Sequence, residues 1–274
     1  MKIFDCFMYF DEDLLLDIRL KILNDHVDKF IIIEAEEDHQ GKKRKLNFDI
    51  SKFSKFKDKI YYIPLRKILI DKSIKIKKNW DKAHLRDQSM RNEISNYLVD
   101  ADDNDWIIIS DLDEIPNPYK IKEFKSKNKF AFFEQNFFYY KFNVLNISQP
   151  FWYGSRICVK KHLKSPQWLR NIKIKKRNVI KRYLFGMNYQ ILKNGGWHFS
   201  NLKTPKELIK KITSFSHGEF NKPELINEKL IEKKIDNLED IFDRNVQYKK
   251  IDIKNNNFPE YLIKNYKKYS DWFI

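Results

Sequence analysis

The feature that most constrains the fold is a short apolar run that ends abruptly in carboxylates. Residues Trp106 to Ile109 show no polar alternation, so they are expected to form a strand that is buried on both faces. Ser110 to Glu114 follow at once and contain three acidic residues. In open α/β sheets, ligands bind at the carboxyl ends of the strands. The sequence therefore predicts a binding site at the end of this strand.

The acidic residues of this site have the spacing of a metal-binding motif. Asp111 and Asp113 can place two hard oxygen ligands on one divalent cation and leave room for waters and a diphosphate. Residues 11–13 and 103–105 have the same spacing, but the start of a helix and a turn explain the acids there. We interpret Asp111 and Asp113 as a metal site for a nucleotide-activated substrate; a solvated loop is the alternative.

Apolar runs alternate with a helical pattern in the first quarter of the chain. Strands are expected over residues 2–10, 30–33 and 60–64. Between the first two, apolar residues from 16 to 27 recur at i, i+4, i+7 and i+11 on one helical face. This order implies right-handed crossovers. We predict an α/β protein with a mostly parallel central sheet flanked by helices.

The length of 274 residues suits one large domain with a substantial core. From residue 204 onward the apolar pattern becomes helical and amphipathic. We find no internal repeat and no clean second domain. We predict a main domain over residues 1–202 and a C-terminal helical extension over residues 203–274, packed on the same domain.

Positive charge is concentrated in one segment. The formal net charge is +16, and residues 135–206 contain 15 Lys and Arg but no Asp or Glu. Such a field attracts nucleic acid, anionic lipid headgroups or phosphorylated substrates, although a biased composition with a solvated face is the alternative. A basic nucleic-acid-binding protein would explain the charge but not the acid-tipped strands, since carboxylates repel phosphate. We therefore disfavour nucleic acid as the partner.

Cysteine content and hydropathy bear on the compartment. No apolar run approaches the roughly 18 residues that cross a bilayer, and the N-terminus lacks the features of a signal peptide. Cys6 and Cys158 lie in apolar runs, where a free cysteine behaves as a small buried hydrophobe. We expect a cytoplasmic protein, with peripheral contact to an anionic membrane through residues 135–206.

A charged pair lies on the helix that precedes the Trp106 strand. Asp87 and Arg91 are an i, i+4 pair and could form a surface ion pair of small energetic value. Because the helix leads directly into the acid-tipped strand, Arg91 could equally lie beside nucleotide phosphates.

A glycine pair precedes an aromatic residue and an imidazole. Gly195 and Gly196 permit a close approach of the backbone, and Trp197 and His198 follow them directly. A histidine in such a position is either a hydrogen-bonded structural residue or a further metal ligand, and we expect His198 to complete the metal shell.

Five strings along the chain resemble glycosyltransferase family 17, which includes β-1,4-mannosyl-glycoprotein 4-β-N-acetylglucosaminyltransferases. They occur in the order seen in that family and span nearly the whole chain. The strings are Asp13 to Arg19, Val27 to Glu34, Ser110 to Pro116, Gly196 to Ser200 and Tyr261 to Tyr266.

The resemblance implies a GT-A-like catalytic domain, a UDP-sugar donor such as UDP-N-acetylglucosamine, a divalent cation such as Mn²⁺ or Mg²⁺, and inversion at the sugar carbon. The acceptor would be a glycan or a glycolipid. The cation would lie on Asp113, with Asp111 directly or through water, and on His198. The residues expected to hold the donor are Glu34, Asp87, Arg91, Asp111 and Trp197.

Inversion by direct displacement needs a carboxylate that deprotonates the acceptor hydroxyl. Residues 135–206 contain none, so the candidates that we consider lie on either side of this segment and are Glu134 and Glu219. We prefer Glu219, because it follows His217 and Gly218 in a stretch that resembles an acidic position of the family. A metal-dependent phosphohydrolase remains the alternative enzyme.

Overall fold

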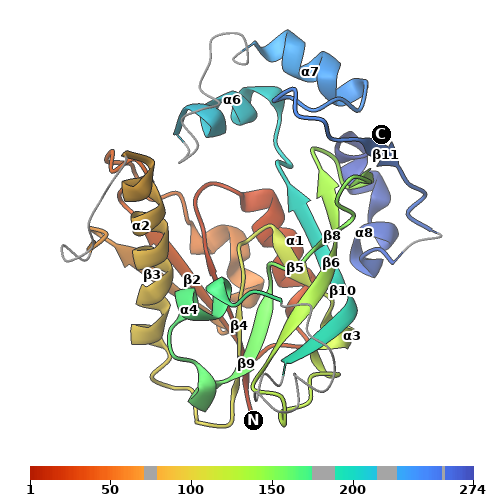
Figure 1. Cartoon of the computed structure of the whole chain (residues 1–274). Helices are drawn as coiled ribbons and strands as arrows, with labels where there is room; N and C mark the ends of the chain where they lie inside the picture. Colours follow the sequence, from red (N-terminus) through yellow and green to blue (C-terminus); the bar gives the residue numbers. More distant parts are fainter. Residues whose placement is uncertain (71–78, 175–188, 215–226, 255–256) are drawn as a thin grey trace.

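The computed structural model describes residues 1–70, 79–174, 189–214, 227–254 and 257–274 (Figure 1). The helices are α1 (Asp13–Leu23), α2 (Asn79–Asn92), α3 (Pro118–Ile121), α4 (Pro166–Asn171), α6 (Pro205–Ser214), α7 (Glu228–Asp236) and α8 (Glu260–Lys264). The strands are β1 (Ile3–Met8), β2 (Lys29–Ala35), β3 (Ile60–Leu65), β4 (Trp106–Ile109), β5 (Glu114–Pro116), β6 (Phe130–Tyr139), β7 (Val144–Asn146), β8 (Phe151–Trp152), β9 (Arg156–Val159), β10 (Tyr189–Ser200) and β11 (Tyr248–Lys250).

One half of the sheet is parallel, as the sequence predicts. β3, β2, β1 and β4 lie side by side in that order, and all three pairings are parallel. β4 is buried at each of its four residues. β3 lies at the edge of the sheet, where Pro64 is tolerated because its missing N–H faces no further strand.

The other half of the sheet corrects the expectation of a mostly parallel arrangement. β9 is antiparallel to β4, and β6 is antiparallel to β7, β8 and β9. β10 is parallel to β6 and antiparallel to β5. The physical reason is connection length: β6, β7 and β8 follow one another closely, and a parallel crossover needs a dozen or more residues.

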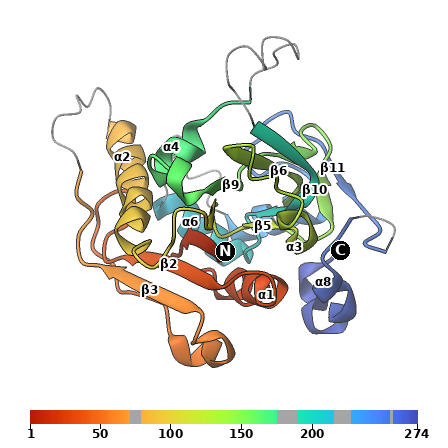
Figure 2. The same ribbon diagram turned by 90° about the horizontal axis from the view of Figure 1, so that it is seen from below.

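Helices cover both faces of the parallel half (Figure 2). On one face, α1 packs its leucines against Phe7, Phe30 and Ile108. On the other face, Met90 of α2 and Leu169 of α4 join the cluster that contains Cys6, Ile33 and Ile109. Cys158 belongs to that cluster as well, so both cysteines are buried as expected. Strands buried on both faces explain the continuous apolar runs of the sequence.

The glycine pair lies inside β10, where the register against β6 shifts between Leu192 and Gly196. Gly196 has φ +143°, and a Cβ there would come within 2.2 Å of the carbonyl oxygen of Ile115 on β5. Only glycine permits both this conformation and this approach. The close pairing with β5 sets His198 opposite Glu114.

The C-terminal segment adds a third apolar cluster, in which α6 and α7 pack beside β6 and β11. The pattern predicted helices here, and β11, which pairs with β7, is an addition to that expectation. α6 and α7 lie at the end of the molecule opposite the N-terminus (Figure 1). None of the helices in the described part of the chain has the length and hydropathy needed to span a bilayer.

A buried arginine links the first strand and helix to the acidic loop. Arg19 of α1 is fully buried and pairs with Asp5 of β1 at 2.6 Å. Its Nη1 also donates to the carbonyl oxygens of Asp111, Leu112 and Glu114, at 2.9 to 3.1 Å. The guanidinium therefore fixes the backbone that carries the acidic side chains.

We expect Arg19→Met to reduce the free energy of unfolding by about 3–5 kcal/mol, because it leaves Asp5 charged and buried without a partner. Lys52→Ala is the matched control, since the Lys52–Asp13 pair also involves α1 but its side chains are 52% and 39% exposed. Exposed pairs of this kind contribute about 0–1 kcal/mol. Urea unfolding of both variants measures the difference, and equal losses would contradict the assigned role of Arg19.

Candidate active site

The parallel strands end in a cavity of about 660 Å³, a size typical of small-molecule sites, which span roughly 300–1,000 Å³. Residues at the carboxyl ends of β1, β2 and β4 line it, together with residues of α2, α4 and α6. The carboxylates lining it, among the described residues, are Asp11, Glu12, Glu37, Asp87, Asp111 and Asp113. The lining Lys and Arg residues are Arg44, Arg91, Arg156, Arg170, Lys203 and Lys211.

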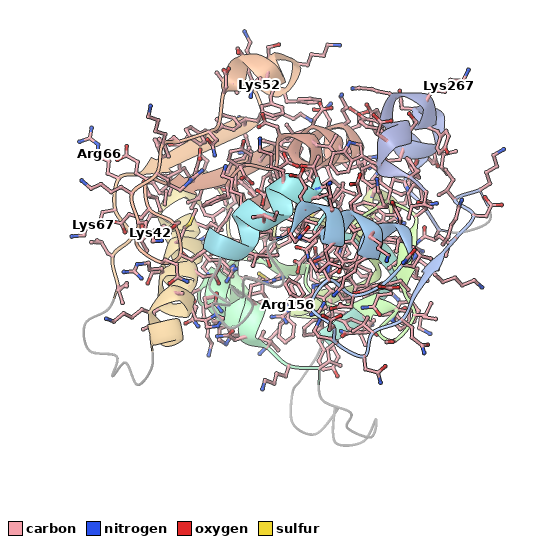
Figure 3. All side chains as sticks on the ribbon, turned by 90° about the horizontal axis from the view of Figure 1, so that it is seen from above. Lys42, Lys52, Arg66, Lys67, Arg156 and Lys267 are labelled. Carbon is pink, nitrogen blue, oxygen red and sulfur yellow. The ribbon has the colours of Figure 1, made fainter. Side chains whose placement is uncertain are left out.

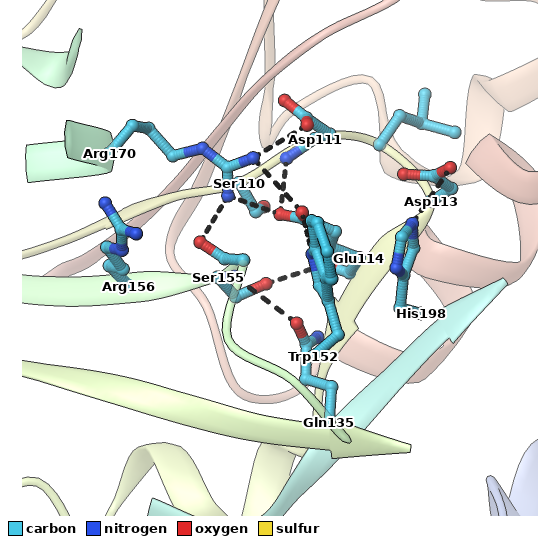
Figure 4. A network of polar contacts seen from close by, with 12 residues as sticks. Ser110, Asp111, Asp113, Glu114, Gln135, Trp152, Ser155, Arg156, Arg170 and His198 are labelled. Carbon is cyan, nitrogen blue, oxygen red and sulfur yellow. Dashed lines mark hydrogen bonds and ion pairs between the residues drawn. The ribbon is translucent and has the colours of Figure 1, made fainter. Parts of the chain in front are cut away.

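Asp111 lies between two arginines. Its Oδ1 is 3.1 Å from Arg91 and its Oδ2 is 2.7 Å from Arg170 (Figure 4). The side chain is 39% exposed. Burial by itself raises the pKa of this carboxyl, but Arg170 and Arg91 outweigh that effect and hold the pKa well below its usual range. Asp111 is therefore ionised at neutral pH and anchors two guanidinium groups at the cavity wall.

Glu114 is a structural acid, 1% exposed. Arg170 binds both of its carboxylate oxygens, at 2.6 and 3.1 Å. Trp152 Nε1 donates to Oε1 at 2.6 Å, and the backbone N–H of Asp111 donates to Oε2 at 3.0 Å. A Cβ on Gly154 would lie 1.8 Å from Oε1, so only glycine fits there. Glu114 thus locks Arg170 and the acidic loop in one geometry.

Arg91 and Asp87 form the expected pair on α2, with Nη1 of Arg91 2.9 Å from Oδ2 of Asp87. Both residues line the cavity. Arg91 also donates to the side chain of Gln167 on α4. Its Nε is buried and has no hydrogen-bond partner within the described ranges. At the cavity wall, the Nε–H group of Arg91 is therefore a hydrogen-bond donor that no described residue uses.

Asp113 and His198 form a second group. Nε2 of His198 lies 3.4 Å from Oδ2 of Asp113, and the imidazole stacks on Phe137 at 4.6 Å. Burial raises the pKa of Asp113, but His198 outweighs it, so the net shift is downward. Nδ1 of His198 is buried and has no hydrogen-bond partner among the described residues. Asp113 lines the cavity, and His198 lies directly behind it.

The donor set of this pair suits a divalent cation only in part. An imidazole nitrogen and a carboxylate oxygen 3.4 Å apart can share one ion at ordinary bond lengths near 2.1 Å. Across the described ranges, no three or more His, Cys, Asp or Glu side chains converge as a metal site. Oxygens of a substrate or of water would complete the shell, as phosphates do in many Mg²⁺ sites.

Two lysines, Lys203 just before α6 and Lys211 within it, interact electrostatically with the acidic residues that follow β1. Nζ of Lys203 is 2.6 Å from Asp11. Burial lowers the pKa of Lys203, but Glu12 and Asp11 outweigh it and raise the pKa above its usual value. Burial also lowers the pKa of Lys211, and Asp113 offsets this only in part. Acidic and basic side chains from several helices and loops therefore line the cavity together.

The family model of glycosyltransferase family 17 matches residues 1–270. The chain belongs to glycosyltransferase family 17. A search of curated proteins found no match. Membership makes the protein a transferase that uses a sugar donor and a glycan acceptor.

Two residues that the sequence assigned to donor binding lie outside the cavity lining of this family 17 glycosyltransferase. Glu34 is fully buried and accepts hydrogen bonds from Arg44, Tyr62 and the backbone N–H groups of residues 47 and 48. Trp197 is buried and donates from Nε1 to the carbonyl oxygen of Asn257 at 2.8 Å. Their polar groups stabilise neighbouring loops.

Of the two candidate bases, one lies away from the cavity lining and the other lies outside the described residues. Glu134 does not line the cavity of the transferase, and its Oε2 accepts a hydrogen bond from the hydroxyl of Tyr153 at 2.8 Å. Glu219 lies outside the described residues. Asp87, Arg91, Asp111 and Asp113, by contrast, are brought together around one cavity.

Several cavity residues were not singled out from the sequence, namely Arg156, Arg170, Lys203, Lys211 and Trp152. Three of these cations, Arg156, Arg170 and Lys203, belong to the acid-free segment 135–206. The charge pattern of that segment was the available signal, but it could not distinguish cations that face the site from those that face solvent.

The pKa shifts give a pH dependence to the stability of the site. The folded-state pKa values of Asp111 and Asp113 lie below the usual 3.8, so both carboxylates stabilise the fold above that pH. This stabilisation decreases as the pH falls below 3.8. We expect the free energy of unfolding to fall less steeply below pH 4 in Asp111→Asn than in the wild type. Urea unfolding measures this, with the exposed Asp25→Asn as the control; equal slopes would contradict it.

Proposed function

We propose that this family 17 protein is a metal-dependent inverting glycosyltransferase that moves N-acetylglucosamine from a UDP-sugar to a hydroxyl of a glycan or glycolipid. The observation that carries the proposal is the acid-tipped β4, whose Asp111 lies between two arginines at a cavity on the carboxyl edge of the sheet. The family match over residues 1–270 supplies the reaction class.

The sheet supports a GT-A-like assignment of the nucleotide-sugar site. Three parallel strands, β2, β1 and β4, direct their carboxyl ends to the cavity, which is the position where open α/β sheets bind ligands. The antiparallel β9 lies beside β4 and brings residues of a later segment to the same edge. We infer that the donor lies across these strand ends.

Arg91 and Arg170 are the proposed ligands of the donor diphosphate. A guanidinium presents five N–H donors in a planar fork that matches phosphate oxygens. Asp87, Asp111 and Glu114 orient the two forks through hydrogen bonds of 2.6 to 3.2 Å. Nucleotide binding would then use groups that are already held in place, which reduces the entropy lost on binding.

Asp113 and His198 are the proposed ligands of the cation, with Asp111 contributing through water. When bound, a divalent ion would offset the negative charge that develops on the departing UDP, an effect worth several kcal/mol. A nitrogen ligand favours Mn²⁺ over Mg²⁺, since Mg²⁺ sites are built mainly from oxygen.

Glu219 is the proposed general base, on the sequence resemblance alone, because its position is not described. It would take the proton of the acceptor hydroxyl. Glu134 is the second candidate, and its hydrogen bond with Tyr153 would have to open before it could accept that proton.

Nucleotide-sugar screening tests the function directly. Thermal-shift measurements with UDP-N-acetylglucosamine and other nucleotide sugars, with and without Mn²⁺, should show stabilisation by a UDP-sugar that increases with Mn²⁺. A glycan acceptor array should then identify the product, and NMR its anomeric configuration. Release of inorganic phosphate without sugar transfer would instead favour a phosphohydrolase.

Removing the proposed metal ligand should abolish transfer. We expect Asp113→Asn to reduce kcat by at least about 10²-fold, since it removes Lewis-acid assistance worth several kcal/mol. Asp103→Asn is the matched control, because Asp103 also belongs to an Asp-x-Asp spacing but is exposed and does not line the cavity. Undiminished activity of the wild type in EDTA would refute the metal assignment.

Replacing the proposed base should separate chemistry from binding. We expect Glu219→Gln to lower kcat by roughly 10²- to 10⁴-fold while the Kd for UDP-sugar stays unchanged. Glu134→Gln serves as the comparison. Wild-type turnover in Glu219→Gln together with a loss in Glu134→Gln would transfer the role to Glu134.

A further inference from the structure

Among the described residues, Arg156 has no acidic partner, in contrast to four neighbouring cations of the cavity. Arg91, Arg170, Arg44 and Lys203 each lie within 3.1 Å of a carboxylate. Arg156 also lines the cavity, yet no carboxylate lies within ion-pair distance of it in the described part of the chain. Figure 4 shows its guanidinium beside Arg170 without a contact to the acids drawn there.

The position of Arg156 is fixed by the sheet and not by an ion pair. It begins β9, in register with Ile109 of β4 and Phe132 of β6. Its guanidinium lies over the ring of Phe132, 5.1 Å from the centroid, and donates from Nη1 to the carbonyl oxygen of Leu169. Nε is buried without a hydrogen-bond partner among the described residues. Within the described ranges, a single hydrogen bond, from Nη1, is therefore made by the five N–H donors of this group.

The surroundings of Arg156 disfavour its charge. Burial, and then the neighbouring Arg170, lower the pKa of the guanidinium to about 10, although Glu114 and Asp111 partly offset this. At neutral pH the group is still charged. A half-buried cation with donors that no described residue uses, next to a second arginine, is an arrangement that a bound oxyanion would stabilise.

We propose that Arg156 binds an oxyanion of the substrate and so extends the donor site beyond Arg91 and Arg170. This inference rests on the proposed function in that the cavity takes a nucleotide sugar. Two sources carry the required chemistry: a phosphate of the donor diphosphate, or a carboxylate on the sugar of a donor other than the UDP-N-acetylglucosamine proposed above. Both would accept N–H donors from a planar guanidinium fork.

Isothermal titration calorimetry of Arg156→Gln tests the proposal with UDP, inorganic pyrophosphate and uridine as probes. If the oxyanion is a donor phosphate, we expect the Kd for UDP and for pyrophosphate to rise roughly 10- to 100-fold, as for loss of charge-assisted hydrogen bonds. The Kd for uridine should stay within about twofold, because uridine carries no phosphate. A purely structural role would not separate these probes.

Arg66→Gln is the matched control. It removes the same charge by the same substitution, but Arg66 is exposed and does not line the cavity. Figure 3 shows Arg66 and Lys67 at the periphery of the molecule and Arg156 within its outline. All three Kd values of this variant should match the wild type within about twofold.

A second arm distinguishes the sources of the oxyanion. If the acidic group is on the sugar, Arg156→Gln should bind UDP like the wild type but lose at least about tenfold in its preference for UDP-glucuronate over UDP-glucose. If neither UDP, pyrophosphate nor this preference changes, the proposal is overturned.

The wild-type protein keeps the proposal testable if the variant does not fold. An arginine-selective dicarbonyl reagent, followed by peptide mass mapping, should modify Arg156 more slowly with saturating pyrophosphate or UDP-glucuronate, while Arg66 reacts at an unchanged rate. An unprotected Arg156 would overturn the proposal. Protection by pyrophosphate in a protein that transfers no sugar would leave the oxyanion site intact and refute only the transferase.

Discussion

The buried contact between Arg19 and Asp5 is the interaction on which the rest of the site depends. It joins α1 to β1 through two short hydrogen bonds, at 2.6 and 2.8 Å. The remaining donors of the same guanidinium hold Ser110 and three carbonyls of the acidic loop. A loop that carries several carboxylates would otherwise spread apart by mutual repulsion. The first helix therefore sets the backbone from which Asp111 and Asp113 reach the cavity.

Around that fixed loop, charge is balanced in a chain of alternating partners. Asp87, Arg91, Asp111, Arg170 and Glu114 follow one another, each within 3.1 Å of the next. Each charge of this chain has an opposite neighbour, which offsets the cost of removing it from water. The chain also places Arg91 and Arg170 at the cavity wall with their carboxylate partners already in contact.

Sequence patterns predicted the parallel half of the sheet and the acidic edge, because β1, β2, β3 and β4 are rich in apolar residues and a helical pattern separates β1 from β2. The antiparallel half was not foreseen, since pairing partners of β6 and β9 depend on tertiary contacts. Glu34 shows why site residues are harder to predict than strands. The strand that carries it was predicted correctly, but the local sequence did not indicate that Arg44 and Tyr62 would donate hydrogen bonds to its carboxylate. Arg170 was missed because its partners, Asp111 and Glu114, are distant in sequence.

That separation affects the order in which the protein matures during synthesis. Arg170 follows Asp111 by 59 residues and Glu114 by 56. At a synthesis rate of about 5–20 residues per second, roughly 3–12 s therefore pass between the synthesis of these acids and that of Arg170. Glu114, which is 1% exposed in the folded protein, lacks its Arg170 partner during that interval. Its strand, β5, pairs with β10, which is synthesised later still. The carboxyl edge of the sheet therefore depends on segments that leave the ribosome well after the four parallel strands.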